Sequence, residues 1–200
     1  MDNTIELSKQ QLKSKRTKER IFQAAKVILA RDGYENLSIK NICEEAGVSN
    51  GSFYHHFKTK DDLLSYYIED HPSVNPDLLS IPRSKEEARE TILSIYADYA
   101  QYCKELGVEF VAGYYTPRNQ ALHPVSRAER PYPIVTVQKF LEKAVGNGSI
   151  SLSCSIEEAA TDIRMIVIGN AFDWALHNGE SDIEANMRRS LGNYLNGIIL

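Results

Sequence analysis

One short segment of the chain gathers side chains that can hydrogen-bond to nucleic acid. It carries an amide, a glycine, a phenol and an imidazole at Asn50, Gly51, Tyr54 and His55. A tyrosine and an amide side by side suit base edges and phosphate oxygens, which offer hydrogen-bond donors and acceptors. The segment therefore predicts a surface that meets a partner, and DNA fits its chemistry.

Two helical patterns that meet at a glycine would position this surface. Ser38 can cap the first helix, whose apolar side is Ile39, Ile42, Cys43 and Ala46. Gly47 suits the left-handed backbone that ends a helix, and Val48 would fill the angle between the two helices. Ser49 can cap the second helix, whose buried side is Phe53 and Phe57. The pattern predicts a helix-turn-helix; the alternative is an ordinary helical hairpin with an aromatic core.

Charge separates this part of the chain from the rest. Residues 9–60 contain 11 lysines and arginines against 5 acidic residues, so they carry +6 in a chain whose net charge is −4. The remainder therefore carries −10, an asymmetry expected when one domain approaches phosphates and the other does not. The basic start of the first helix can lie near phosphates or be merely solvated: Lys13, Lys15, Arg16, Lys18 and Arg20.

The run Val48–Leu64, VSNGSFYHHFKTKDDLL, resembles the signature of the TetR family of transcriptional regulators. The resemblance extends back through Ile21, Phe22, Ala24, Ala25, Gly33, Tyr34, Ser38, Ile39, Ile42 and Ala46. It covers roughly a quarter to a third of the chain, and the rest is similar only in helical character and length. It implies an all-α protein of about nine helices, with an N-terminal three-helix helix-turn-helix DNA-binding domain and a helical bundle for ligand binding and dimerisation.

The same resemblance implies roles for single residues. Base-facing positions fall on Lys40, Asn50, Gly51, Tyr54 and His55. Phosphate-facing positions fall on Ser38, Ser52, His56 and Lys60. A dimer would place two recognition helices in successive major grooves about 34–36 Å apart, so the double-stranded operator should be palindromic. A metal site at the two histidines is not expected, because adjacent residues on a helix point about 100° apart and no third ligand lies near.

Prolines and capping patterns organise the rest of the chain. Pro72, Pro76 and Pro82 predict a linker over 71–83, between a DNA-binding domain over 1–70 and an effector-binding and dimerisation domain over 84–200. Capping boxes are predicted for Thr59 with Asp62, Ser84 with Glu87, Ser155 with Glu158, and Ser181 with Glu184. Helices are predicted over about 15–32, 84–106, 132–145, 156–177 and 182–199, with a short aromatic segment after Gly107 and an irregular connection over 117–133.

The last two helices, about 156–199, are apolar on more than one side. A helix of this kind usually packs on its own domain and on something else, for which a second copy is the simplest choice. The pattern Gly169, Trp174, Gly179 resembles the four-helix dimer interface of the TetR family. The alternative is a monomer with a thick core.

Family resemblance further implies a pocket for a small-molecule effector whose binding releases DNA. Candidate lining residues are Tyr96, Tyr99, Phe110, Tyr114, Tyr115, His123, Phe172 and Trp174. They would suit a mid-sized, partly aromatic or amphipathic compound, and Asp98 and Asp173 could pair with a cationic one. Core packing explains each residue equally well. The alternative is a DNA-binding dimer of the same family without a pocket, controlled by a protein partner or by DNA alone. Repressor is the commoner role in the family.

Other classes of protein find little support. The sequence has no nucleophile elbow, phosphate loop or metal triplet, so we expect neither an enzyme nor a cofactor. It lacks an apolar run of about 18 residues and an export signal near its start, which predicts a cytoplasmic protein that does not enter membranes. Cys43, Cys103 and Cys154 are interpreted as reduced thiols, with Cys103 serving packing or, alternatively, redox sensing.

Overall fold

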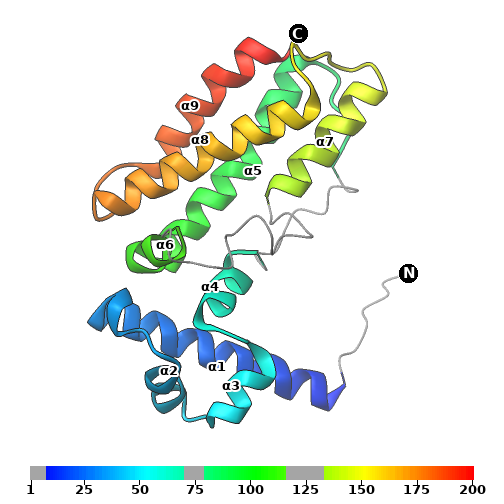
Figure 1. Ribbon diagram of the computed structural model, residues 1–200. Helices are drawn as coiled ribbons and strands as arrows, with labels where there is room; N and C mark the ends of the chain where they lie inside the picture. Colours follow the sequence, from blue (N-terminus) through cyan, green and yellow to red (C-terminus); the bar gives the residue numbers. More distant parts are fainter. Residues whose placement is uncertain (1–7, 70–78, 116–132) are drawn as a thin grey trace. The chain divides into compact units, whose positions relative to one another are not determined.

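The chain folds into helices throughout the part that the structure describes. The computed structural model describes residues 8–69, 79–115 and 133–200. These ranges contain nine α-helices and, apart from one isolated bridge between Leu152 and Ile199, no β-pairing (Figure 1). The all-α prediction of about nine helices is confirmed. The described residues form two compact units that divide between Leu64 and Ser65, here called the N-terminal and C-terminal units.

The N-terminal unit is built from α1 (Lys9–Asp32), a 3-10 turn η1 (Tyr34–Asn36), α2 (Ile39–Ala46), α3 (Asn50–His56) and the start of α4 (Lys60–Glu69). Helix α1 packs against α2, and α2 packs against α3 (Figure 1). The largest buried side chains of this core are Ile21, Phe22, Ile28, Leu29, Leu37, Ile42, Phe53, Phe57, Leu63 and Leu64. The aliphatic and aromatic spacing in the sequence thus becomes one small core beneath α3.

The ends of these helices follow from their capping residues. Helix α1 begins earlier than the predicted Lys15, because Ser8 and Gln11 form a capping box with N···O distances of 3.2 and 2.8 Å. Helix α4 opens on the predicted box, in which the Asp62 amide donates to the Thr59 hydroxyl at 3.0 Å and the Thr59 amide donates to the Asp62 carboxylate at 3.1 Å.

The C-terminal unit is a bundle of five further helices. They are α5 (Lys85–Leu106), α6 (Val108–Tyr114), α7 (Ile134–Gly146), α8 (Ile156–Leu176) and α9 (Ile183–Ile198). Helix α8 packs against α6, α7 and α9, and α5 packs along α9 (Figure 1). Polar pairs join α5 to α9 in antiparallel order: Arg89 with Asn196, Glu90 with Arg188, and Lys104 with Glu184.

Two of the three capping boxes predicted for this unit are not formed as predicted. At the start of α5 the Ser84 hydroxyl accepts from the Glu87 amide at 3.2 Å, but the Glu87 carboxylate accepts from the Arg83 amide and not from that of Ser84. Ser155 and Glu158 do form a capping box at the start of α8. At the start of α9, however, Asp182 takes the place predicted for Ser181, and its carboxylate accepts from the Ala185 amide at 3.1 Å. The carboxylate is a charged acceptor one residue further along the chain, which favours a later start of the helix.

Several predictions fall outside the described residues. They are the domain boundary at Asp70, the prolines at 72 and 76, most of the connection over 117–133, and His123. The helix predicted from Tyr132 begins at Ile134. Among the described helices, none combines the length and apolar character needed to cross a membrane.

Candidate nucleic-acid interface

The turn between α2 and α3 is fixed by backbone geometry and by a side chain from α1. Gly47 has φ 61° and ψ 43°, the left-handed conformation predicted for it. The Val48 amide donates to the Cys43 carbonyl at 3.0 Å, which closes the end of α2. From the other side, the Arg20 guanidinium donates to the carbonyls of Ala46 at 2.6 Å and Gly47 at 3.1 Å.

Helix α3 is held by two buried aromatic rings. Phe53 is 0% exposed and Phe57 is 4% exposed, and their ring centroids lie 5.7 Å apart. Burial of a side chain of this size contributes about 1.5–3 kcal/mol, so α3 cannot rotate about its axis without losing both. The Ser49 hydroxyl accepts from the Ser52 amide at 3.1 Å and fixes the start of the helix.

The opposite side of α3 is open to solvent. Asn50, Gly51, Tyr54 and His55 are all exposed, and Tyr54 is 57% exposed although it is aromatic. The centroids of the Tyr54 and Phe53 rings lie 5.8 Å apart, and the ring planes are at 86° to each other. This edge-to-face arrangement directs the phenol away from the core. Four of the five predicted base-facing residues therefore share one exposed surface.

The residues predicted on α2 lie at its beginning. Lys40 is exposed, and its ammonium lies 4.0 Å from the Glu44 carboxylate. This exposed pair contributes little and leaves the ammonium available to an anion. Ser38 caps α2, because its hydroxyl oxygen accepts from the Asn41 amide at 3.1 Å. The hydroxyl hydrogen remains free to donate to a phosphate.

Lys60 has a structural role that the sequence did not reveal. Its ammonium donates to the Leu37 carbonyl at 3.0 Å and lies 4.2 Å from the centroid of the Tyr34 ring. The Tyr34 hydroxyl in turn donates to Asp61 at 3.0 Å. These contacts join the start of α4 to the segment before α2. The predicted phosphate contact of Lys60 would be made by an ammonium that already bonds to the backbone.

His56 is half-buried beside the end of α3. Burial lowers the pKa of its imidazole, and the nearby His55 and Lys18 lower it further. The ring is therefore neutral at pH 7 and can donate one N–H group to a phosphate. The His55 and His56 rings lie 4.9 Å apart, and the described residues contain no third ligand that would complete a metal site with them.

The candidate effector residues of the C-terminal unit divide between its core and its surface. Tyr96, Tyr99, Phe110, Tyr114 and Trp174 are buried, and Tyr115 is half-buried. The hydroxyls of Tyr99 and Tyr115 lie 2.5 Å apart, and burial of Tyr99 raises its pKa well above the usual value. Phe172 is 41% exposed, so the structure does not bring it together with these residues.

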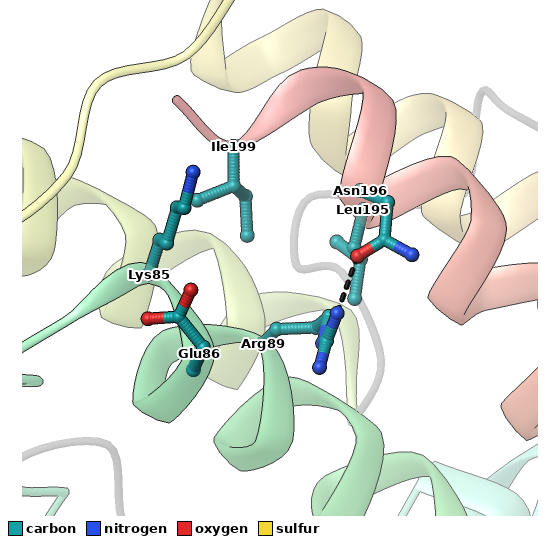
Figure 2. A pocket seen from close by; sticks show the side chains of 6 residues that line it. All are labelled: Lys85, Glu86, Arg89, Leu195, Asn196 and Ile199. Atoms are coloured by element: carbon teal, nitrogen blue, oxygen red, sulfur yellow. Dashed lines mark hydrogen bonds between the residues drawn. The ribbon is translucent and has the colours of Figure 1, made fainter.

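Two hollows lie away from the predicted effector residues. A cavity of about 70 Å³ between α5 and α9 is lined by Lys85, Glu86, Arg89, Leu195, Asn196 and Ile199 (Figure 2). In Figure 2 the Arg89 guanidinium reaches across to the Asn196 amide, which closes one side. It has room for a few water molecules. An open groove of about 320 Å³ between α1 and α2 is lined by Glu19, Arg20, Gln23, Ala24, Val27, Glu45 and Ala46.

Comparison with known proteins places this arrangement in a family. Residues 21–67 match the family model of bacterial regulatory proteins of the tetR family. The uncharacterized HTH-type transcriptional regulator YerO of Bacillus subtilis is 27% identical over 180 residues, which are 84% of this chain and 59% of YerO. The HTH-type transcriptional regulator SAUSA300_2515 of Staphylococcus aureus is 38% identical over 56 residues, 28% of this chain and 30% of that protein. The chain thus spans less than two thirds of these curated relatives.

Solved structures share the fold at low identity. NalD, the secondary repressor of the MexAB-OprM multidrug efflux pump in Pseudomonas aeruginosa, superposes with a TM-score of 0.63 at 16% identity, over 94% of this chain and 98% of NalD. FadR of Thermus thermophilus, a TetR family repressor solved with lauroyl-CoA, gives a TM-score of 0.57 at 20% identity. The match covers 90% of this chain and 94% of FadR. These relatives are transcriptional regulators rather than enzymes. Residues 21–67 thus match the tetR family of bacterial regulatory proteins, and the chain as a whole shares the fold of a solved TetR family repressor.

Proposed function

We propose that this protein is a cytoplasmic, homodimeric transcriptional regulator that binds a palindromic operator through α3. The observation that carries the proposal is the exposed surface of Asn50, Gly51, Tyr54 and His55, on a helix that Phe53 and Phe57 fix from beneath. An exposed tyrosine beside an amide offers donors and acceptors at the depth of a major groove. Lys40 adds a further base-facing group from α2, and Ser38, Ser52, His56 and Lys60 supply groups for phosphate contacts.

An apolar stripe on α8 supports the dimer. Met165 is 63%, Phe172 41% and Leu176 63% exposed, and their spacing with Gly169 puts all four on one side of the helix. A side chain placed at Gly169 would meet nothing within 4 Å, so a partner helix can approach closely there. Exposed apolar side chains grouped in this way mark an interaction surface. A second copy of the chain, packed against the segment over 156–199, would bury them.

An effector-controlled repressor is the form of regulation that we favour. The hydroxyl of the buried Tyr99 pairs with that of the half-buried Tyr115, and polar groups on a largely apolar helical core can orient an amphipathic ligand. FadR, solved with lauroyl-CoA, shows that this fold accommodates an acyl compound in another protein. An effector that binds the DNA-free state of the dimer more tightly than the DNA-bound state would release the operator.

The close packing of the same residues favours a second candidate. Tyr96, Tyr99, Phe110 and Tyr114 are each at most 2% exposed. A core of this density needs no ligand. In that case the protein is a DNA-binding dimer of the same family that responds to a protein partner or to DNA alone.

In-vitro selection of duplex DNA tests the main proposal. The wild type should enrich sequences with a two-fold repeat, and Tyr54→Ala should lose the enrichment. Tyr54→Phe, which keeps the ring and removes only the hydroxyl, separates stacking from hydrogen bonding. Absence of enrichment by the wild type at moderate salt would refute sequence-specific binding.

Thermal stabilisation separates the two forms of regulation. With a panel of amphipathic compounds, a rise in melting temperature together with release of the selected duplex supports the effector. Unchanged melting across acyl and aromatic compounds, with tight DNA binding retained, supports the second candidate.

A further inference from the structure

Helix α1 extends well beyond the core that supports it. None of the side chains of residues 9–20 is buried, and the buried residues of α1 begin at Ile21. This segment, here called the α1 extension, is about 18 Å long at about 1.5 Å per residue. Helices in proteins are usually stabilised by an apolar face packed on the core, which the extension lacks. It begins instead on the capping box of Ser8 and Gln11.

The α1 extension is strongly basic. It carries Lys9, Lys13, Lys15, Arg16, Lys18 and Arg20 against a single acid, Glu19. Lys9, Lys13, Lys15 and Arg16 are exposed and form no ion pair with any residue that the structure describes. The spacing of Lys9, Lys13 and Arg16 places their like charges on one side of the helix, where they repel one another. An anionic partner would remove that repulsion.

The α1 extension adjoins the end of α3. The Lys18 ammonium lies 5.9 Å from the centroid of the Phe57 ring, directly after α3. Lys18 is also one of the charges that lower the pKa of His56, at the last position of α3. Towards its N-terminal end, α1 continues past α3 (Figure 1). The positive charge therefore begins where the surface of α3 ends.

We propose that the α1 extension is a phosphate-binding arm, which holds the backbone of duplex DNA just outside the bases that α3 contacts. This inference rests on the proposed function. Duplex DNA carries a negative charge about every 1.7 Å along its axis, so an arm of about 18 Å passes several phosphates. Lysine and arginine contacts to phosphates add affinity and salt dependence without choosing a sequence.

Salt titration of a charge-neutralised arm provides the test. The arm variant is Lys13→Gln/Arg16→Gln, and the matched control is Lys139→Gln/Lys143→Gln, which removes two cations from α7 in the other unit. Each protein is titrated with a selected duplex in two lengths. The short duplex ends at the bases that α3 protects, and the long one continues about five base pairs further on each side, the reach of the arm at about 3.4 Å per step.

On the long duplex the arm variant should bind at least about tenfold more weakly than the wild type, and its salt slope should fall by about 0.9 for each phosphate that the arm no longer neutralises. On the short duplex the two proteins should bind alike, and the control should match the wild type on both. The preference for the selected sequence over a scrambled one should not change. Equal affinities and slopes on the long duplex would overturn the arm.

Two further outcomes separate this inference from the proposed function. If the wild type binds no duplex, the proposed function fails and the arm fails with it. If the wild type binds and Tyr54→Ala loses selectivity while the arm variant binds as the wild type does, only the arm is refuted. If the wild type binds phosphatidylserine vesicles and the arm variant does not, while both bind DNA equally well, the arm is refuted and the α1 extension is reassigned to an anionic membrane surface. Far-UV circular dichroism should be unchanged in the variant, because both side chains are exposed.

Discussion

The guanidinium of Arg20 caps the helix that ends at Ala46. It donates to the Ala46 carbonyl at 2.6 Å and to the Gly47 carbonyl at 3.1 Å, so a side chain of α1 satisfies the end of α2 at the turn that leads to α3. The positive charge also faces the negative end of the helix dipole. An arginine that sequence pattern placed near DNA phosphates or in solvent instead supports the turn.

Replacement of Arg20 by alanine should loosen the helix-turn-helix. We expect a loss of about 1–2 kcal/mol, the usual contribution of hydrogen bonds to a charged donor at a partly exposed site. Amide hydrogen exchange in α2 and α3 should measure the loss of stability locally. Tryptophan fluorescence would not report it, because the only tryptophan, Trp174, lies in the other unit. Arg16→Ala is the control, because the Arg16 side chain is exposed and forms no ion pair with any residue that the structure describes. Equal exchange rates in the two variants would refute the capping role.

Replacement of Phe172 by glutamate should produce monomers. The residue is 41% exposed on α8 beside Met165 and Leu176, so its charge would be buried between two copies at a large cost in free energy. Sedimentation velocity should show dissociation, and affinity for a two-fold DNA site should fall with it. Ile81→Glu, at a 52% exposed apolar residue outside α8, should sediment as the wild type does. A dimeric Phe172→Glu protein would contradict the proposed interface.

The stability of the N-terminal unit should fall in mildly acidic solution because of His56. Burial, and after it His55 and Lys18, places the pKa of His56 below its ordinary value of 6.5, so the unfolded chain takes up the proton more readily than the folded one. The contribution of this pKa difference to the free energy of unfolding is complete above pH 6.5 and is lost as the pH falls through the pKa of His56 in the folded protein. His56→Gln should reduce the change in melting temperature between about pH 7.5 and 5.5. An unchanged difference would exclude His56 as its source.

Cys103 should be unreactive in the folded protein. Burial raises the pKa of its thiol to about 12, so almost no thiolate exists at pH 8. Cys43 is also buried, whereas Cys154 is partly exposed. A disulfide reagent at pH 8 should therefore modify Cys154 quickly and all three thiols only after denaturation. A fast phase that persists in Cys154→Ser would restore a redox role for one of the buried thiols.

The sequence predicted those features whose cause is local. Gly47 needs its left-handed backbone whatever surrounds it, and Thr59 with Asp62 forms a cap from residues three positions apart. The roles of Arg20 and Lys60 were missed because their acceptors, Ala46 and Leu37, lie far away in the chain. Only the fold brings such partners together.

Two features that the sequence analysis missed could have been predicted from residue spacing alone. Ser8 and Gln11 have the spacing of a capping box, which indicates the early start of α1. Phe172 and Trp174 are two residues apart, and on an α-helix such residues point about 160° away from each other. They could not line one enclosure, and the structure indeed leaves Phe172 exposed while Trp174 is buried.

Helix α8 uses separate residues for its two sides. Ala159, Ile163, Val167, Ala171 and Trp174 are buried within the chain, whereas Met165, Phe172 and Leu176 are 41–63% exposed on its surface. The outward set can therefore be rewritten without redesigning the fold. Two versions of the chain with opposite charges or complementary sizes at these positions would pair only with each other. If the two versions also differ in α3, the resulting heterodimer would bind an asymmetric DNA site.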